Sequence, residues 1–174
     1  AVGIDWRGKP EVVANVTDGR LDLGPYLPKS AAENETGGRR WSLSPIGTSW
    51  LRGVRLDATV DMERLTADGL SLAPFHASLA ISDGRMVAED LRGGIGEGEI
   101  GGRMTFGADG VPFVEAEVQG RGVQLSPMLA ALLGELPALE GDADFEAALE
   151  GRGVTAFDMI RALSGRIEIT RADL

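Results

Sequence analysis

Apolar and polar residues alternate along most of the chain from Val54 onward. In the first clear segment, Leu56, Ala58, Val60 and Met62 occupy every second position, and charged or hydroxyl residues lie between them. Successive side chains of a β-strand point to opposite faces of the sheet, so this strand has one apolar and one polar face. Such a pattern is typical of antiparallel strands that are covered on one side only. We therefore expect a mainly β (α+β) fold built on a curved antiparallel sheet.

The alternation recurs in further segments, which are separated by turn signals such as Asp83-Gly84 and Asp109-Gly110. Asp18-Gly19 predicts a hairpin over residues 11–23 in the same way. About eight strands spaced by roughly 4.8 Å would form a face on the order of 40 Å long. Glu115 and Glu117 are expected on the solvent side of the sheet. The predicted apolar face contains Leu56, Val60, Met62, Leu79, Ile81, Met104, Phe106, Val114, Val118, Phe145 and Leu149.

Residues 115–134 and 146–165 form an internal repeat with an offset of 31 residues. Each copy reads as an alternating strand, a Gly-Arg-Gly turn and a short apolar helix, which gives helices near 127–133 and 157–163. Thr155 and Asp158 resemble a capping box for the second helix. The polar, Pro- and Gly-containing stretch 29–49 is expected to be a flexible loop.

Length and composition limit the functional classes. The 174 residues fit a single domain, 1–174, and the sequence begins in the middle of a strand-like pattern, so we expect a fragment of a longer protein. The 27 acidic and 17 basic residues give a net charge of −10, which argues against nucleic acid as a partner. The chain has no cysteine, so disulfides and thiolate metal sites are excluded. No apolar run is long enough to span a membrane.

The motifs with possible chemistry are weak. Residues 96–101 fit the G-x-G-x-x-G pattern of dinucleotide loops, but a strand pattern follows where a helix is required, and Glu97 and Glu99 would repel a phosphate. His76, the only histidine, lies at a polar strand position without a metal-ligand pattern around it. Paired carboxylates such as Asp142 and Asp144 also lie at outward strand positions. The sequence therefore predicts no enzyme, no metal site and no cofactor.

The apolar face has two interpretations. In the first, the helices close over the sheet and make an ordinary core, which is the simpler interpretation because most one-sided sheets are packed in this way. In the second, the face is a groove for an apolar ligand. An aliphatic lining with few aromatic residues suits flexible acyl chains, which need contact area rather than directional contacts. The residues alone leave both interpretations open.

Several phrases of the sequence, taken in order, resemble the C-terminal region of AsmA-family proteins. They are GRLDLGPYLPK, then a strand of alternating Asp and aliphatic residues in SWLRGVRLDATVDMERL, the hairpin ISDGRMVAEDL, the strand GGRMTF, the phrase QGRGVQLSPMLAALLG, and the closing LSGRIEI. The order of the phrases carries the resemblance, and it covers nearly the whole chain.

The resemblance implies an envelope protein of Gram-negative bacteria. AsmA-like proteins are held in the inner membrane by an N-terminal helix, face the periplasm and are related to TamB and to bridge-like lipid transfer proteins. The implied function is to bind or conduct phospholipid acyl chains along an apolar β-groove, in support of outer-membrane biogenesis and lipid homeostasis. The implied partners are a phospholipid or other acyl-chain ligand and the remainder of the parent protein with its membrane anchor. The alternative is a non-catalytic structural module with a closed core that assembles with neighbouring domains or with outer-membrane assembly partners.

Overall fold

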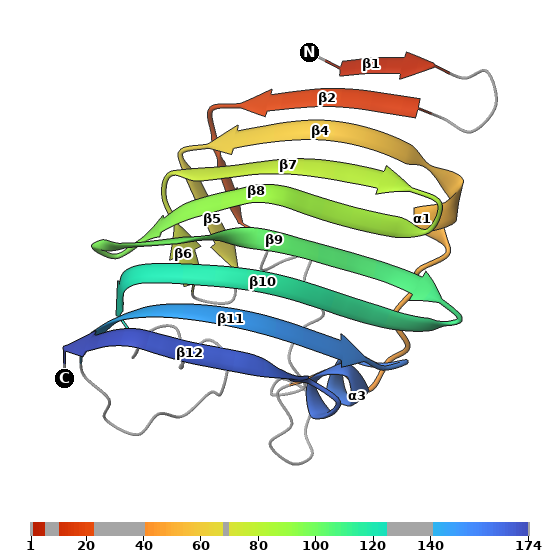
Figure 1. Cartoon of the computed structure of the whole chain (residues 1–174). Helices are drawn as coiled ribbons and strands as arrows, with labels where there is room; N and C mark the ends of the chain where they lie inside the picture. The colour runs from red at the N-terminus through yellow and green to blue at the C-terminus, as the bar shows by residue number, and fades with distance from the viewer. Residues whose placement is uncertain (1, 6–10, 23–40, 68–69, 125–140, 174) are drawn as a thin grey trace, which may run out of the picture.

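A nine-stranded sheet dominates the protein (Figure 1), in the order β1-β2-β4-β7-β8-β9-β10-β11-β12. The structure is a computed structural model that describes residues 2–5, 11–22, 41–67, 70–124 and 141–173. The strands of this sheet are β1 (Val2–Asp5), β2 (Glu11–Thr17), β4 (Arg55–Met62), β7 (Phe75–Ser82), β8 (Arg85–Ile95), β9 (Gly98–Asp109), β10 (Val111–Gln124), β11 (Asp142–Arg152) and β12 (Ser164–Asp173).

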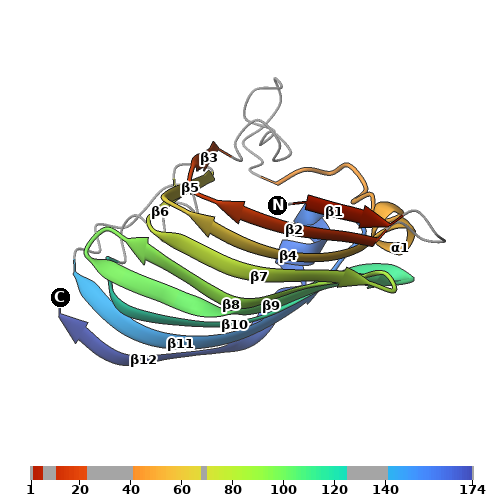
Figure 2. The same ribbon diagram turned by 90° about the horizontal axis from the view of Figure 1, so that it is seen from above.

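The remaining elements lie on one side of this sheet. A small second sheet contains β3 (Arg20–Asp22), β5 (Arg64–Ala67) and β6 (Leu70–Leu72), and the helices are α1 (Trp50–Gly53) and α3 (Ala156–Arg161). Figure 2 shows that the large sheet curves and that the small sheet and both helices lie on the inner side of the curve. None of the described helices has the length and apolar character needed to cross a membrane.

The strand register confirms the predicted faces. From β4 to β7, Ala58 lies opposite Leu79, and from β9 to β10, Met104 lies opposite Ala116. Ala116 in turn lies opposite Leu149 of β11. Directly paired residues of neighbouring strands share a face, so the alternating apolar residues of successive strands line up across the sheet. We call this the apolar face, and its opposite the polar face.

The predicted hairpin over residues 11–23 is wrong. β2 and β3 belong to different sheets, and each runs parallel to a later strand, so that Glu11 pairs with Arg55 and Arg20 pairs with Arg64. Asp18 and Gly19 have positive φ values of 57° and 140°, but they redirect the chain from the large sheet to the small one. The segment from β4 to β5 also passes from the large sheet to the small one beside them, and there the Asp18 N–H donates to the carbonyl oxygen of Asp61 at 3.0 Å. The large sheet is therefore mixed rather than wholly antiparallel.

Two β-bulges keep apolar residues on the apolar face. In β8 the register shifts between Ala88 and Leu91, and in β10 it shifts between Gly120 and Val123. Each extra residue adopts a positive φ, 51° at Asp90 and 57° at Gly122. A bulge inserts one extra residue into a strand. The side chains after it therefore point to the opposite face from the one that strict alternation would give them. Without the second bulge Val123, which is fully buried, would turn toward the polar face.

The first Gly-Arg-Gly of the repeat is this bulge rather than the predicted turn, because residues 120–122 lie inside β10. In the second copy Gly151 and Arg152 end β11, and α3 follows. The helix expected near 127–133 falls outside the described residues. The same is true of residues 29–40 of the expected loop, whereas 41–49 is described and bonds to the start of α3. There Ile46 N–H donates to Val154 O at 2.8 Å.

The second helix begins with the predicted cap. The Thr155 hydroxyl oxygen accepts a hydrogen bond from the Asp158 N–H at 3.0 Å. The hydroxyl also donates to the Asp158 carboxylate at 2.8 Å, whereas in a complete capping box that carboxylate would accept from the Thr155 backbone. Met159 of this helix is buried against the sheet, so the cap holds in place an element that covers the apolar face.

Thr155→Ala is therefore expected to lower the free energy of unfolding by about 1 kcal/mol, the usual effect of losing an N-cap side chain. Urea denaturation measures the change. Thr17→Ala, at an exposed position near the end of β2, provides the control. If the two substitutions lower the free energy of unfolding equally, the hydrogen bond of the Thr155 cap does not stabilise the fold.

Candidate functional site

All eleven residues predicted to form the apolar face lie on one side of the large sheet. The pairings Leu56–Ile81, Ile81–Met86, Met86–Phe106, Phe106–Val114 and Val118–Ala147 connect them from β4 to β11. Glu115 and Glu117 are exposed on the polar side, as expected from the alternation. The structure therefore brings the predicted residues together into one continuous surface across the sheet.

The burial of these residues is uneven. Val60, Ile81 and Phe145 are buried, with 8%, 5% and 7% of their surface exposed. The others keep part of their surface in contact with solvent. These half-buried residues are Leu56, Met62, Leu79, Met104, Phe106, Val114, Val118 and Leu149.

Close packing at one end of the apolar face comes from the small sheet. Leu70 and Leu72 of β6 contact a cluster formed by Ile95, Val123 and Phe145. A β-carbon at Gly93 would lie 3.0 Å from the Leu72 side chain, so the missing side chain there allows β6 to approach the sheet. This end of the apolar face is therefore an ordinary packed core.

Helices close the opposite end of the strands. Leu51 of α1 is completely buried, and Met159 of α3 is 9% exposed. A β-carbon at Gly151 would lie 2.9 Å from the backbone oxygen of Met159, so α3 rests directly on the β11 backbone. The Arg52 guanidinium on α1 donates to the carbonyl of Ala108 at 3.1 Å and ties α1 to the end of β9. Of the half-buried residues, Leu79, Met104 and Leu149 lie between the two packed ends, where Ala88, which pairs with both Leu79 and Met104, is 1% exposed.

This middle region offers aliphatic contact rather than chemistry. Leu79, Met104 and Leu149 are typical of it, and their side chains carry no group that could transfer a proton or attack a substrate. An aliphatic chain placed there would gain about 0.8 kcal/mol for each CH₂ group removed from water. Aliphatic side chains also impose little geometry on a ligand, so the surface suits a flexible apolar chain better than a rigid polar molecule.

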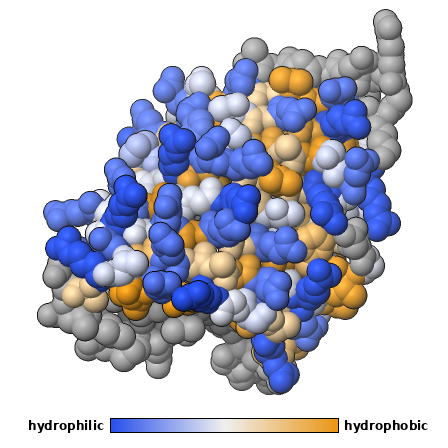
Figure 3. Space-filling model, viewed as in Figure 1, coloured by the Kyte–Doolittle hydropathy of each residue, from blue (hydrophilic) through white to orange (hydrophobic). Residues whose placement is uncertain are grey.

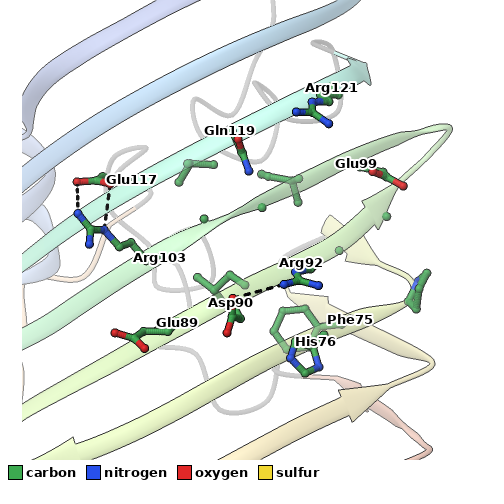
Figure 4. A pocket seen from close by; sticks show the side chains of 18 of the residues that line it. Phe75, His76, Glu89, Asp90, Arg92, Glu99, Arg103, Glu117, Gln119 and Arg121 are labelled. Carbon is green, nitrogen blue, oxygen red and sulfur yellow. Dashed lines mark hydrogen bonds and ion pairs between the residues drawn. The ribbon is translucent and has the colours of Figure 1, made fainter.

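The polar face carries a different feature, a wide hollow of about 1400 Å³ that is open to solvent. Hydrophilic residues dominate this face of the molecule (Figure 3). The residues labelled in Figure 4 line this hollow and come from β7, β8, β9 and β10. Among them are Arg92, Arg103, Glu117 and Arg121. Sequence reasoning identified the outward charges but not the hollow, because its shape depends on the curvature and register of seven strands.

Opposite charges in the hollow are paired with one another. Arg103 and Glu117, directly opposite in the β9–β10 register, form two hydrogen bonds of 3.0 and 2.6 Å. Arg92 lies 3.4 Å from Asp90. The hydrogen bond from Arg103, with its positive charge, holds the pKa of the Glu117 carboxyl below its ordinary value. These pairs neutralise the face locally, but the lining has nine carboxylates and four arginines, so the hollow is acidic as a whole.

Arg103→Gln should raise the pKa of Glu117 toward its ordinary value, because the cation that stabilises the carboxylate is removed. A lowered folded-state pKa stabilises the fold above the unfolded pKa, and this contribution is lost as the pH falls through the folded pKa. Both side chains are exposed, so we expect a small effect on stability. Carbon NMR of the Glu117 carboxyl measures its titration, and an unchanged midpoint in the variant would contradict the assignment.

The other candidate motifs have structural roles in the sheet. Gly96 has a φ of 62° and lies in the tight turn between β8 and β9, so the G-x-G-x-x-G segment joins two strands and does not open a helix. His76 Nδ1 lies 2.6 Å from the Asp61 carboxylate in a cross-strand pair on the polar face. Among the residues that the structure describes, no three His, Asp or Glu side chains gather in a way that could hold a metal ion.

One buried residue of the polar face was missed. Phe113 is 3% exposed although its position in the alternation places it on the polar face. The guanidinium carbons of Arg85 and Arg152 lie 5.5 and 5.1 Å from its ring centroid, a distance at which cations are attracted to aromatic rings. Gly107, directly opposite, leaves room for the ring. A Phe at an outward position of β10, facing Gly107 on the next strand, was the available signal.

Comparison with known proteins adds one match. The family model described as "AsmA family" matches residues 27–173, which is nearly the whole chain. No curated protein and no solved structure matches the chain.

Proposed function

Because this chain belongs to the AsmA family, we propose that it binds or conducts phospholipid acyl chains along the apolar face of its large sheet. It does so as the periplasmic part of an inner-membrane-anchored envelope protein that supports outer-membrane lipid homeostasis. Family membership supports the placement in the envelope and a lipid-related role. The geometry of the apolar face supports the specific ligand.

A single observation carries the proposal. The apolar face extends across the sheet from β4 to β11, and most of the predicted residues on it remain half-buried while both strand ends are packed. A closed core would remove these residues from solvent as completely as it removes Val60 and Ile81. Partly exposed aliphatic side chains in a continuous row leave contact area for an apolar ligand.

The mechanism is passive. An acyl chain leaves water for the surface around Leu56, Leu79, Met104 and Leu149, and the gain is proportional to the apolar area that is removed from water. The head group stays in solvent, since none of the described residues of the apolar face carries a charge to hold it. Nine strands spaced by about 4.8 Å give a face roughly 40 Å wide, long enough for an acyl chain and comparable to the thickness of a bilayer.

The competing function is a structural module in which the apolar face is fully closed. Burial of Val60, Ile81 and Phe145 and the packing of β6, α1 and α3 favour it at the ends of the strands. Under this alternative the apolar face binds nothing, and the protein acts through contacts with neighbouring domains. The two functions predict different behaviour for the half-buried residues.

Leu79→Asp tests the proposal. In an accessible groove the new carboxylate remains partly hydrated, so the melting temperature should stay within several degrees of the parent value while binding of a fluorescent phospholipid falls at least about ten-fold. In a closed core the same charge would lack water and partners, and the fold would collapse. Thermal melts and lipid titrations of the same preparation measure both quantities.

Val87→Asp is the matched control, because Val87 is also half-buried but lies on the polar face between the uncharged residues Ala80 and Thr105. It introduces the same charge into the same sheet and should leave lipid binding unchanged. The proposal fails if the parent chain binds no phospholipid, or if both substitutions reduce binding equally.

A further inference from the structure

Exposed apolar side chains gather at one end of the large sheet. Figure 1 shows α1, α3 and the β7–β8 and β9–β10 hairpins at this end, with segment 41–49 running between the two helices. We call it the helix end. The large apolar side chains that are 37–53% exposed there are Leu43, Trp50, Val111, Val154, Ile160 and Leu163. Apolar residues that gather on a surface in this way mark a site of contact with a partner or a membrane.

Backbone pairing places two of these residues side by side. Beyond the end of β11, the Gly153 N–H donates to the carbonyl oxygen of Pro112 at 3.0 Å. The β10–β11 ladder therefore continues by one more pair, and Val111 and Val154 follow it on neighbouring segments of the chain.

Segment 41–49 connects this pair with the two helices. The Phe157 N–H donates to the carbonyl oxygen of Ser42 at 3.2 Å, which places Leu43 beside α3. At the other end of the segment, the indole N–H of Trp50 donates to the carbonyl oxygen of Gly47 at 3.0 Å. The polar atom of the indole is thus already bonded, and the exposed part of Trp50 is mainly its ring.

Three arginines at the helix end are held without losing their charge. The Arg52 guanidinium donates to a backbone carbonyl, and Arg152 and Arg161 lie over the rings of Phe113 and Phe157, 5.1 and 5.6 Å from the centroids. Neither a carbonyl nor an aromatic ring neutralises a cation. In the described part of the chain, no carboxylate forms an ion pair with these three arginines. Their positive charge therefore remains available to an anionic partner.

The two ends of the strands have opposite net charge. The helix end has five arginines and three aspartates, a net charge of +2, in residues 41–55, 82–85, 108–112 and 152–163. The other end has nine carboxylates and five arginines, a net charge of −4, in residues 17–22, 61–67, 92–99, 120–124, 141–144 and 171–173. The 14 residues of β10, at about 3.3 Å each, separate the two ends by roughly 45 Å. Charges in solvent are screened over about 10 Å, so the acidic end does not counteract the positive one.

We propose that the helix end docks on the surface of a phospholipid bilayer that contains anionic lipids. The exposed aliphatic side chains and the Trp50 ring enter the membrane interface, a region in which tryptophan is favoured. The arginines lie at the level of the lipid phosphates and supply the electrostatic attraction. Charge complementarity selects this partner, since the positive charge and the exposed apolar residues occupy the same end of the molecule. The strands then stand on the membrane with their acidic end directed away from it.

This inference goes beyond acyl-chain binding and does not depend on it. It also gives the apolar face a position relative to the membrane. Leu79 and Leu149 lie three residues before the ends of their strands at Ser82 and Arg152, a distance of about 10 Å. If the proposed function also holds, the half-buried middle of the apolar face lies within about that distance of the lipid surface.

Charge reversal at matched positions tests the orientation. The double variant R55E/R161E reverses two exposed arginines at the helix end, and R64E/R121E reverses two exposed arginines at the other end, so both change the net charge equally. Co-sedimentation of the 174-residue chain with vesicles of phosphatidylcholine and about 30% phosphatidylglycerol measures the affinity. We expect R55E/R161E to bind at least about ten-fold more weakly than the parent and R64E/R121E to bind like the parent. Circular dichroism confirms that both variants are folded.

A fluorescent probe locates the contact with lipid. The chain has no cysteine, so Val154→Cys and Glu97→Cys each create a single labelling site. Val154 lies at the helix end, and Glu97 lies in the turn between β8 and β9 at the other end. An environment-sensitive dye at position 154 should shift its emission to the blue when the same vesicles are added, and a dye at position 97 should not.

Several results would overturn the proposal. A parent chain that does not bind these vesicles leaves the helix end as a surface for a protein. Equal binding to vesicles of phosphatidylcholine alone, or equal losses in the two double variants, shows that the arginines of the helix end do not direct the contact. Titration with a soluble short-chain fluorescent phospholipid measures acyl-chain binding separately, and R55E/R161E should bind it like the parent. Failure of docking and failure of the proposed function are thereby distinguished.

Discussion

Val60→Asp is expected to unfold the chain, in contrast to the same substitution at Leu79. Val60 is 8% exposed and lies in β4 opposite the buried Ala77. A carboxylate at this position would be removed from water without a partner, at a cost of several kcal/mol. Because a domain of this size is stable by only about 5–15 kcal/mol, most of the molecules would lose the native sheet.

The measurement is the midpoint of urea denaturation for both variants beside the parent chain. Val60→Thr is the matched control, since it keeps the branched shape of valine and adds a hydroxyl without a charge. We expect Val60→Thr to remain folded and Val60→Asp to have no cooperative transition. A cooperative transition for Val60→Asp near that of the parent would mean that water reaches the buried part of the apolar face.

Phe145→Ala is the second substitution with a large expected effect, a loss of about 3–5 kcal/mol in the free energy of unfolding. Phe145 is 7% exposed in the cluster with Ile95 and Val123, and a β-carbon at Gly120 would lie only 2.3 Å from its ring. The ring therefore fills the space over Gly120, and its removal leaves a cavity that the neighbouring backbone cannot close.

Ile169→Ala is the control, because Ile169 lies directly opposite Phe145 on the same face but is 57% exposed. We expect it to change stability by less than about 0.5 kcal/mol. Chemical denaturation of both variants measures the difference. If the two substitutions cost the same, the cluster around Phe145 is not the packed core that its burial indicates.

The faces of the sheet could be predicted from the sequence, whereas its connections could not. Period-two alternation depends only on local geometry, so Leu79, Met104 and Val118 were placed correctly on one side. The parallel pairing of β2 with β4 joins segments that are 44 residues apart, as in Glu11 with Arg55, and no local signal specifies such a pairing. Asp18-Gly19 has the residues of a hairpin turn, but tertiary pairing directs the chain to another sheet.

The candidate site could be predicted as a list of residues but not as an accessible surface. Alternation treats Val60 and Leu79 alike, although Val60 is buried and Leu79 is half-buried, and this difference depends on the tertiary packing over each position. Bulges at Asp90 and Gly122 also escaped prediction, because a single extra residue reads as a break in the alternation. Cross-strand pairs such as Arg103 with Glu117 require the register, which the sequence does not contain.

Site-specific photocrosslinking tests the central claim most directly. A benzoylphenylalanine in place of Leu79 or Leu149 on the apolar face, or of Val87 or Gln119 on the polar face, is irradiated with phospholipid vesicles, and lipid adducts are detected by mass spectrometry. The proposed function predicts acyl-chain adducts at Leu79 and Leu149 and none at Val87 and Gln119. Absence of adducts at both apolar positions, or equal labelling of the two faces, would contradict it.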